Sequence, residues 1–319
     1  QFELFKDGHF NIESFEKAVK KEAASGSVRV LLNFPQNPSG YSPTKDEAKE
    51  ICRVLKETAA AGAKILAISD DAYFGLNYEN DIEPESLFAK TCDLDKNILA
   101  VKIDGPTKED FVWGFRSGFI TFGNAQMSDE QYSALITKLM GIIRSSVSCS
   151  STPPQSLLLR AMKDPETEKQ KQEYRKILEE RYAIVRNFVD THSCSCLKPL
   201  PFNSGYFMSF EVIGKDAELL RKKILQEYGI GTVSIDSKTL RVAFSSIEKE
   251  KLDNEEIKSA FCSDKYVGMI LEKGGKNISY NMKVYKTSGK KVLDIDFNDE
   301  YNDVQIIGNE IMMNSISQC

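Results

Sequence analysis

The sequence predicts an α/β protein with a mostly parallel sheet, and three features of the chain support this. Short apolar runs rich in β-branched residues occupy 28–34, 64–70 and 97–104, each with the length of a strand. Their apolarity is continuous rather than alternating, which is typical of parallel strands buried on both faces. A helical pattern between the first two runs completes a strand–helix–strand unit, from which such sheets are built.

The helix after the first strand is predicted from its start and its end. Thr44 and Glu47 have the spacing of a capping box. Apolar residues then recur at helical spacing until Gly62. A further strand at 117–123 follows the third run after a loop too short for a crossover helix, so we expect it to be antiparallel to its neighbour.

The chain then becomes helical, and from Leu197 it alternates between strands and helices. Three helices are expected, one capped by Ser128, one opening at Pro153 and a long one starting at Pro165. Later elements form an α+β pattern: strands at 206–212 and 240–244, a helix at 216–228 and a last helix at 252–261. These patterns divide the chain into a large domain over 1–165 and a small α+β domain, with its connecting helix, over 166–262.

The remaining tail, 263–319, has the pattern of β-strands separated by polar and glycine-rich turns. The predicted strands are 266–272, 278–285, 291–297 and 304–313, the last interrupted by Gly308-Asn309 as a bulge or a turn. The tail resembles a blade of a β-propeller or a similar repeat, which cannot bury its own faces. We therefore expect an added module unrelated to the rest.

The composition excludes several classes of protein. The 319 residues are 41% hydrophobic and 28% charged, as in globular proteins, and the net charge of −5 disfavours a nucleic-acid or anionic-membrane surface. No apolar run approaches the roughly 20 residues of a membrane span, and no signal-peptide pattern is present, so we expect a cytoplasmic protein. Seven scattered cysteines indicate reduced thiols. Only Cys194 and Cys196 form a close pair, and with His192 alone nearby we expect no metal site.

Varied polar residues follow the predicted strands in order. Asn37 comes after the first strand, Asp70 and Tyr73 after the second, and Lys108 and Arg116 after the third. Open α/β sheets bind ligands at the carboxyl edge of their strands, so this edge is the predicted site. Taken singly, each residue also has a plain structural interpretation, such as a turn for Asn37 and solvation for Lys108.

Together the motifs resemble the class I/II aminotransferases of pyridoxal-phosphate fold type I. The matching pieces are Asn-Pro-Ser-Gly at 37–40, Asp-x-Ala-Tyr at 70–73, and Lys108 followed by Arg116 within Gly-x-Arg-x-Gly. Arg241 in a late strand also matches, so the resemblance extends to about Phe261. It implies a partial aminotransferase-like large domain, a smaller α+β domain and the added β-strand tail.

The resemblance implies a role for each residue. Lys108 is the expected Schiff-base residue and proton carrier, and Asp70 is expected to hold the pyridine nitrogen protonated. Asn37 and Tyr73 are expected to bind the ring's 3-oxygen, and Arg116 to pair with the cofactor phosphate. Arg241, with Asn37, is expected to bind the substrate's α-carboxylate. The implied activity is a transaminase that exchanges an α-amino acid with a 2-oxo acid, in a homodimer.

Two departures from the family accompany these expectations. Gly105 stands where the family has Ser or Thr, and Thr107 is a candidate to take over the role of that residue. Residues 1–27 are shorter than the family's N-terminal segment. Two alternatives remain open at this point. One is a β-eliminating carbon–sulfur lyase, which uses the same lysine and aspartate. The other is a non-catalytic, incomplete aminotransferase-like chain.

Overall fold

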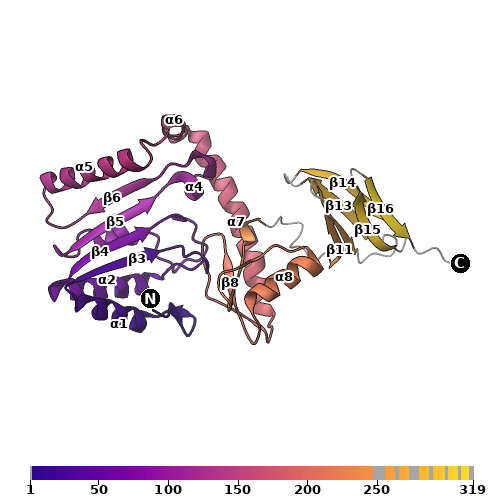
Figure 1. Ribbon diagram of the computed structural model, residues 1–319, viewed down its shortest axis with the longest axis horizontal. Coiled ribbons are helices and arrows are strands. Elements are labelled where there is room, and N and C mark those ends of the chain that lie inside the picture. Colours follow the sequence, from indigo (N-terminus) through magenta and orange to yellow (C-terminus); the bar gives the residue numbers. More distant parts are fainter. Residues whose placement is uncertain are drawn as a thin grey trace. The chain divides into compact units, whose positions relative to one another are not determined.

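The computed structural model describes residues 2–246, 256–262, 266–272, 280–286, 290–298, 301–307 and 310–315 (Figure 1). The chain forms two compact units. The first unit comprises Gln1–Glu211 and Arg241–Ser245, and the second comprises Val212–Leu240 and Ser246–Cys319. All six predicted site residues belong to the first unit.

The first unit contains the predicted mostly parallel sheet. Its order is β3-β4-β5-β6, formed by Ser27–Asn33, Lys64–Asp70, Ile98–Asp104 and Phe119–Gly123. The first two pairings are parallel and the third is antiparallel, which confirms the expectation for the strand after Lys108. The register places Asn33 beside Asp70, and Asp70 beside Ile103.

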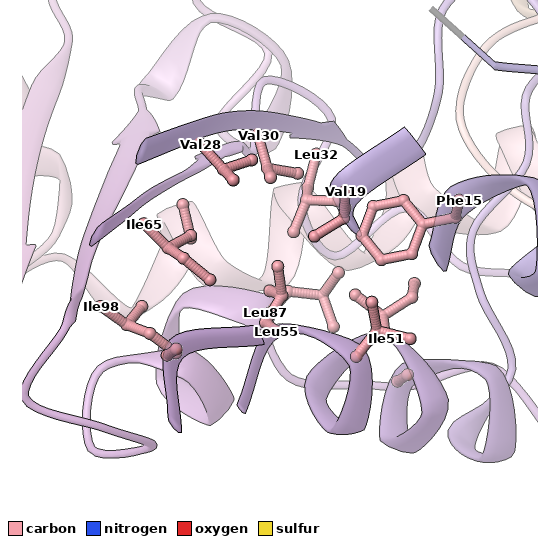
Figure 2. Packing of buried hydrophobic residues seen from close by; sticks show 14 of the residues in the cluster. Phe15, Val19, Val28, Val30, Leu32, Ile51, Leu55, Ile65, Leu87 and Ile98 are labelled. Atoms are coloured by element: carbon pink, nitrogen blue, oxygen red, sulfur yellow. The ribbon is translucent and has the colours of Figure 1, made fainter. Parts of the chain in front are cut away.

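Helices α1 (Ile12–Ala23) and α2 (Lys45–Ala60) cover one side of this sheet (Figure 1). The Thr44–Glu47 capping box is present in both directions and fixes the start of α2. Figure 2 shows how buried side chains of β3 meet those of the helices. The packed set includes Phe15, Val19, Val28, Val30, Leu32, Ile51, Leu55, Ile65, Leu87 and Ile98. Smaller elements complete this region: β1 (Phe5–Lys6), β2 (His9–Phe10) and α3 (Leu87–Thr91).

The opposite side of the sheet is only partly covered. Val28, Val30 and Leu32 are buried, whereas Leu31 on the same strand is 65% exposed. Ile103 and Ile120 are paired on neighbouring strands, and both are also exposed. The expectation of strands buried on both faces is therefore wrong for these positions, because the described elements pack on one face and leave apolar side chains open on the other.

A helical segment follows the sheet. It contains α4 (Pro106–Glu109), the 3-10 turn η1 (Trp113–Phe115), α5 (Asp129–Ser146), α6 (Thr152–Ala161) and α7 (Pro165–Thr191). No residue of α5 is buried, while Leu178 and Tyr182 of α7 are. Across the described ranges, no helix combines the length and apolar character that crossing a membrane requires.

A second sheet has the order β7-β8-β10-β9, and it places Arg241 on a strand as predicted. Its strands are Leu197–Pro199, Met208–Val212, Thr239–Val242 and Val233–Ser234. Helix α8 (Ala217–Tyr228) ends at Gly229, whose left-handed conformation (φ 64°) is the predicted C-terminal stop. The 3-10 turn η2 (Phe244–Ser246) follows β10.

The tail forms antiparallel sheets, as its strand pattern predicted. One has the order β11-β12-β13-β14, from Glu256–Cys262, Tyr266–Glu272, Tyr280–Lys286 and Lys291–Phe297. The other pairs β15 (Tyr301–Ile307) with β16 (Glu310–Ser315). The expected strand at 304–313 is therefore two strands. The predicted turn residues Gly274, Gly275, Ser288, Gly289, Gly308 and Asn309 lie outside the described residues.

The expected helix at 252–261 is wrong where the structure describes it. Residues 256–262 form β11, which pairs with β12 and places Phe261 opposite Gly268. A Cβ at Gly268 would collide with the Phe261 ring, so the glycine makes room for this pairing. Contacts with a neighbouring strand thus override the local helical pattern.

Candidate functional site

Asn37 and Arg241, far apart in sequence, are hydrogen bonded. Arg241 Nη1 donates to Asn37 Oδ1 at 2.9 Å. The guanidinium carbon of Arg241 lies 4.3 Å from the ring centroid of Phe207, a cation–π contact. Arg241 Nε is buried and has no hydrogen-bond partner. The hydrogen bond and the ring contact thus hold the side chain in place.

The turn that carries Asn37 passes very close to strand β8. Gly40 has φ +77°, and a Cβ there would collide with the carbonyl oxygen of Phe207. Ser209 Oγ donates to the carbonyl oxygen of Pro38 at 2.8 Å. The Asn-Pro-Ser-Gly motif therefore has a structural reason for its glycine.

Asn33, the last residue of β3, connects two of the predicted site residues. Its Oδ1 accepts a hydrogen bond from the backbone N–H of Asn37 at 3.0 Å. Its Nδ2 donates to the carbonyl oxygen of Asp70 at 3.4 Å. Sequence reasoning missed this residue. The available signal was an amide ending an apolar strand just before the motif.

Asp70 and Tyr73 lie at the end of β4, where Asp70 Oδ1 accepts from the backbone N–H of Ala72 at 3.3 Å. Tyr73 is buried, and its ring meets those of Tyr206 and Phe207 edge-on at 5.4 and 5.7 Å. Burial raises the pKa of Tyr73, and the Asp70 charge adds to this while Arg241 opposes it. Tyr73 therefore keeps its proton and can donate a hydrogen bond.

Lys108 lies in α4 with its amine beside Tyr73. The distance from Lys108 Nζ to the Tyr73 ring centroid is 5.0 Å. Burial lowers the pKa of Lys108, the nearby Arg116 charge lowers it further, and Asp70 opposes both. The hydroxyl of Tyr206 donates to the carbonyl oxygen of Lys108 at 3.4 Å. A lowered pKa favours the neutral amine, which is the nucleophilic form.

Arg116 influences Lys108 through its positive charge, which lowers the pKa of the amine. It has a left-handed backbone conformation (φ 52°), and its Nη1 donates to the carbonyl oxygen of Trp113 at 3.4 Å. Two cationic side chains in the segment between β5 and β6 suit an anionic ligand.

Close backbone packing accounts for the departure at Gly105. A Cβ at this position would lie 2.7 Å from the carbonyl oxygen of Ser117. A Cβ at Gly118 would lie 3.2 Å from the carbonyl oxygen of Asp104. The close neighbour of Gly118 is therefore backbone, whereas a Cβ at Gly114 would have nothing within 4 Å. Serine or threonine at Gly105 would require the backbone at Ser117 to move.

Three charged side chains lie together at the ends of β4 and β5, and Asp71 is the buried one. Lys102 Nζ lies 2.5 Å from Asp104 Oδ2 and 3.9 Å from Asp71 Oδ2. Burial raises the pKa of Asp71. The sequence analysis singled out neither Asp71 nor Lys102, although a lysine within an apolar strand is a usable signal. In the described residues no three His, Cys, Asp or Glu side chains converge to hold a metal ion.

Two family models match parts of this sequence. The family model "Aminotransferase class I and II" matches residues 1–254, and a "Family of unknown function (DUF5711)" matches residues 235–319. Among curated proteins no sequence matches the chain.

Solved structures of aminotransferases share the fold. An aminotransferase from Anaerococcus prevotii is 26% identical with a TM-score of 0.68, covering 79% of this chain and 61% of its own. A kynurenine aminotransferase from Pyrococcus horikoshii, in complex with PMP, is 20% identical with a TM-score of 0.61, covering 78% and 59%. An alanine aminotransferase from Pyrococcus furiosus is 20% identical with a TM-score of 0.60, covering 79% and 60%. This chain thus spans about 60% of the length of these proteins. With a family model matching most of its length, the chain belongs to the class I and II aminotransferases.

Proposed function

We propose that this chain carries the cofactor-binding residues of a pyridoxal-phosphate-dependent aminotransferase that acts on an α-amino acid and a 2-oxo acid. The observation that carries the proposal is the environment of Lys108. Its amine lies 5.0 Å from the centroid of the Tyr73 ring and has a lowered pKa, with Asp70 and Arg116 close enough to influence it. Such an amine is suited to react with an aldehyde.

The residues fit pyridoxal phosphate, the cofactor of this family. To bind this cofactor, a protein needs a primary amine for the aldehyde, a carboxylate for the pyridine nitrogen and a cationic side chain for the phosphate. These groups are supplied by Asp70 at the end of β4, Lys108 in α4 and Arg116 after η1. Tyr73, which retains its proton because burial raises its pKa, supplies a donor for the ring oxygen.

When bound, pyridoxal phosphate supplies an aromatic ring that accepts electrons. The protein residues have separate tasks around it. Lys108 attaches the cofactor and then moves a proton as a neutral amine, which its lowered pKa favours. Asp70 keeps the pyridine nitrogen protonated, and Arg116 binds the phosphate. Asn37 and Tyr73 hydrogen bond to the 3-oxygen.

Arg241 is the proposed residue for the substrate carboxylate. Its guanidinium is fixed by the hydrogen bond to Asn37 and by the ring of Phe207. A guanidinium fixed in this way binds a carboxylate with a defined orientation, because less side-chain entropy is lost on binding. A homodimeric assembly and a cytoplasmic location complete the proposal.

The test is to incubate the purified protein with pyridoxal phosphate, reduce it with borohydride and map the adduct by mass spectrometry. We expect an adduct on Lys108, its loss in Lys108→Ala, and its retention in Lys163→Ala, which removes an exposed lysine. An adduct pattern that is the same in all three proteins would contradict the proposal. Incubation with an amino acid and a 2-oxo acid then identifies the reaction. Exchange of the amino group supports a transaminase, whereas ammonia and pyruvate without exchange indicate the lyase.

A further inference from the structure

Two cysteines that the proposed function does not use lie side by side. Cys194 Sγ and Cys196 Sγ are 3.0 Å apart. They belong to the turn that joins the end of α7 at Thr191 to the start of β7 at Leu197. The backbone N–H of Leu197 donates to the carbonyl oxygen of Cys194 at 3.4 Å, which closes the turn. Cys194 is exposed and Cys196 is partly exposed, so reagents in solution can reach them.

The other described cysteines differ from this pair. Burial raises the pKa of Cys52 to about 11 and also raises the pKa of Cys92, which suppresses their reactive thiolate forms. Cys149 is exposed but belongs to the segment before α6. Among the cysteines whose side chains the structure describes (Cys52, Cys92, Cys149, Cys194 and Cys196), only the turn at 194–196 brings two thiols into contact.

We propose that Cys194 and Cys196 are a reversible dithiol–disulfide modification site, oxidised by low-molecular-weight disulfides. A disulfide bond is about 2.05 Å long, so the two sulfur atoms need to approach by only about 1 Å. The turn lies outside the sheets that carry the candidate site residues, since it precedes the first residue of β7. This inference is therefore independent of the proposed aminotransferase activity.

The reaction balances as two thiol–disulfide exchanges. One thiolate attacks a sulfur atom of the small disulfide, forms a mixed disulfide and releases one small thiolate. The second cysteine's thiolate then attacks the protein sulfur of the mixed disulfide and releases the other small thiolate. The protein loses two protons and two electrons, which together are two hydrogen atoms, and the small disulfide is reduced to two thiols.

The test is to titrate the purified protein with oxidised glutathione and record intact and peptide masses. We expect the tryptic peptide that contains both cysteines to lose two hydrogen atoms and to regain them with dithiothreitol. Cys194→Ser and Cys196→Ser should each lose this change and retain one glutathione instead. Cys149→Ser should leave the change intact. Stable glutathione adducts on both cysteines of the unmodified sequence, with no internal disulfide, would overturn the proposal.

A second probe reports the same geometry without oxidation. Phenylarsine oxide binds two thiols together, so we expect one equivalent to bind tightly to the reduced protein at this turn. Either serine variant should reduce the affinity at least tenfold, while Cys149→Ser should not. Equal affinity for the unmodified protein and both serine variants would show that the pair does not act as a dithiol.

Discussion

At the scale of single residues, the pKa of Lys108 connects the sequence motif to its chemistry. Burial and Arg116 lower this pKa, and Asp70 opposes them. Asp70→Asn should therefore lower the pKa further, and Arg116→Met should raise it. Labelling of Lys108 by acetic anhydride across pH, read from peptide masses, measures the shift. The same titration midpoint in all three proteins would show that burial alone sets the pKa.

The same shift predicts a contribution to stability. The folded chain binds fewer protons at Lys108 than the unfolded chain between the lowered pKa and the ordinary value of 10.5. The contribution of Lys108 to the free energy of unfolding should therefore increase as pH rises through this window. Comparing urea unfolding of the unmodified protein and Lys108→Met across pH isolates it. A difference that stays constant over the window would contradict the assigned cause.

Arg241 provides a second test at this scale. Arg241→Met removes the donor proposed for the substrate carboxylate, and hydrogen bonds to charged groups contribute about 1.5–3 kcal/mol. We expect the KM for the amino acid to rise by about ten- to a hundredfold. Arg186→Met is the matched control, because Arg186 also lies over an aromatic ring, that of Phe202 at 5.1 Å. An equal rise for both variants would indicate a packing effect.

At the scale of elements, the N-terminus of α2 is stabilised by more than its capping box. Glu47 also accepts hydrogen bonds from the backbone N–H of Phe10 and from the hydroxyl of Tyr41. Thr44→Ala should lower the free energy of unfolding by about 1 kcal/mol. Ser128→Ala removes the cap of α5, a helix without buried residues, and should cost less. Urea unfolding followed by circular dichroism measures both, and equal costs would contradict this reasoning.

Strand β3 offers a matched pair of neighbouring leucines. Leu32 is 4% exposed and packs in the core shown in Figure 2, whereas Leu31 is 65% exposed. Leu32→Ala should lower the free energy of unfolding by about 2–5 kcal/mol. Leu31→Ala should change it by no more than about 0.5 kcal/mol. A cost at Leu31 as large as at Leu32 would show that another surface covers Leu31 in solution.

At the scale of the whole molecule, the chain combines two units with separate cores. Ile270 is fully buried in the tail, among side chains of its own sheets. Ile270→Ala should destabilise the tail by about 2–5 kcal/mol and leave cofactor attachment to Lys108 unchanged. Hydrogen exchange of peptides from 266–297, together with the borohydride adduct, measures both effects. Loss of the adduct in this variant would show that the two units depend on each other.

Local signals in the sequence were enough to predict much of the fold. The β-branched runs, the Thr44–Glu47 cap and the stop at Gly229 act over a few neighbouring residues, so α2, α8 and the parallel strands were predicted near their observed bounds. The order of the predicted site residues along the chain was also visible, because Asp70 and Tyr73 come at the end of one apolar run and Lys108 and Arg116 come after the next.

Contacts between residues far apart in the sequence were visible only in the tertiary structure. Three contacts join residues far apart in the sequence: the hydrogen bond between Arg241 and Asn37, the hydrogen bond from Asn33 to Asp70, and the ion pair between Lys102 and Asp71. Residues 256–262 became a strand because β12 pairs with them. The sequence by itself determined which groups stand at the strand ends. Packing between distant segments determined which of those groups touch and which amine has a lowered pKa, since desolvation and neighbouring charges act only once the chain has folded.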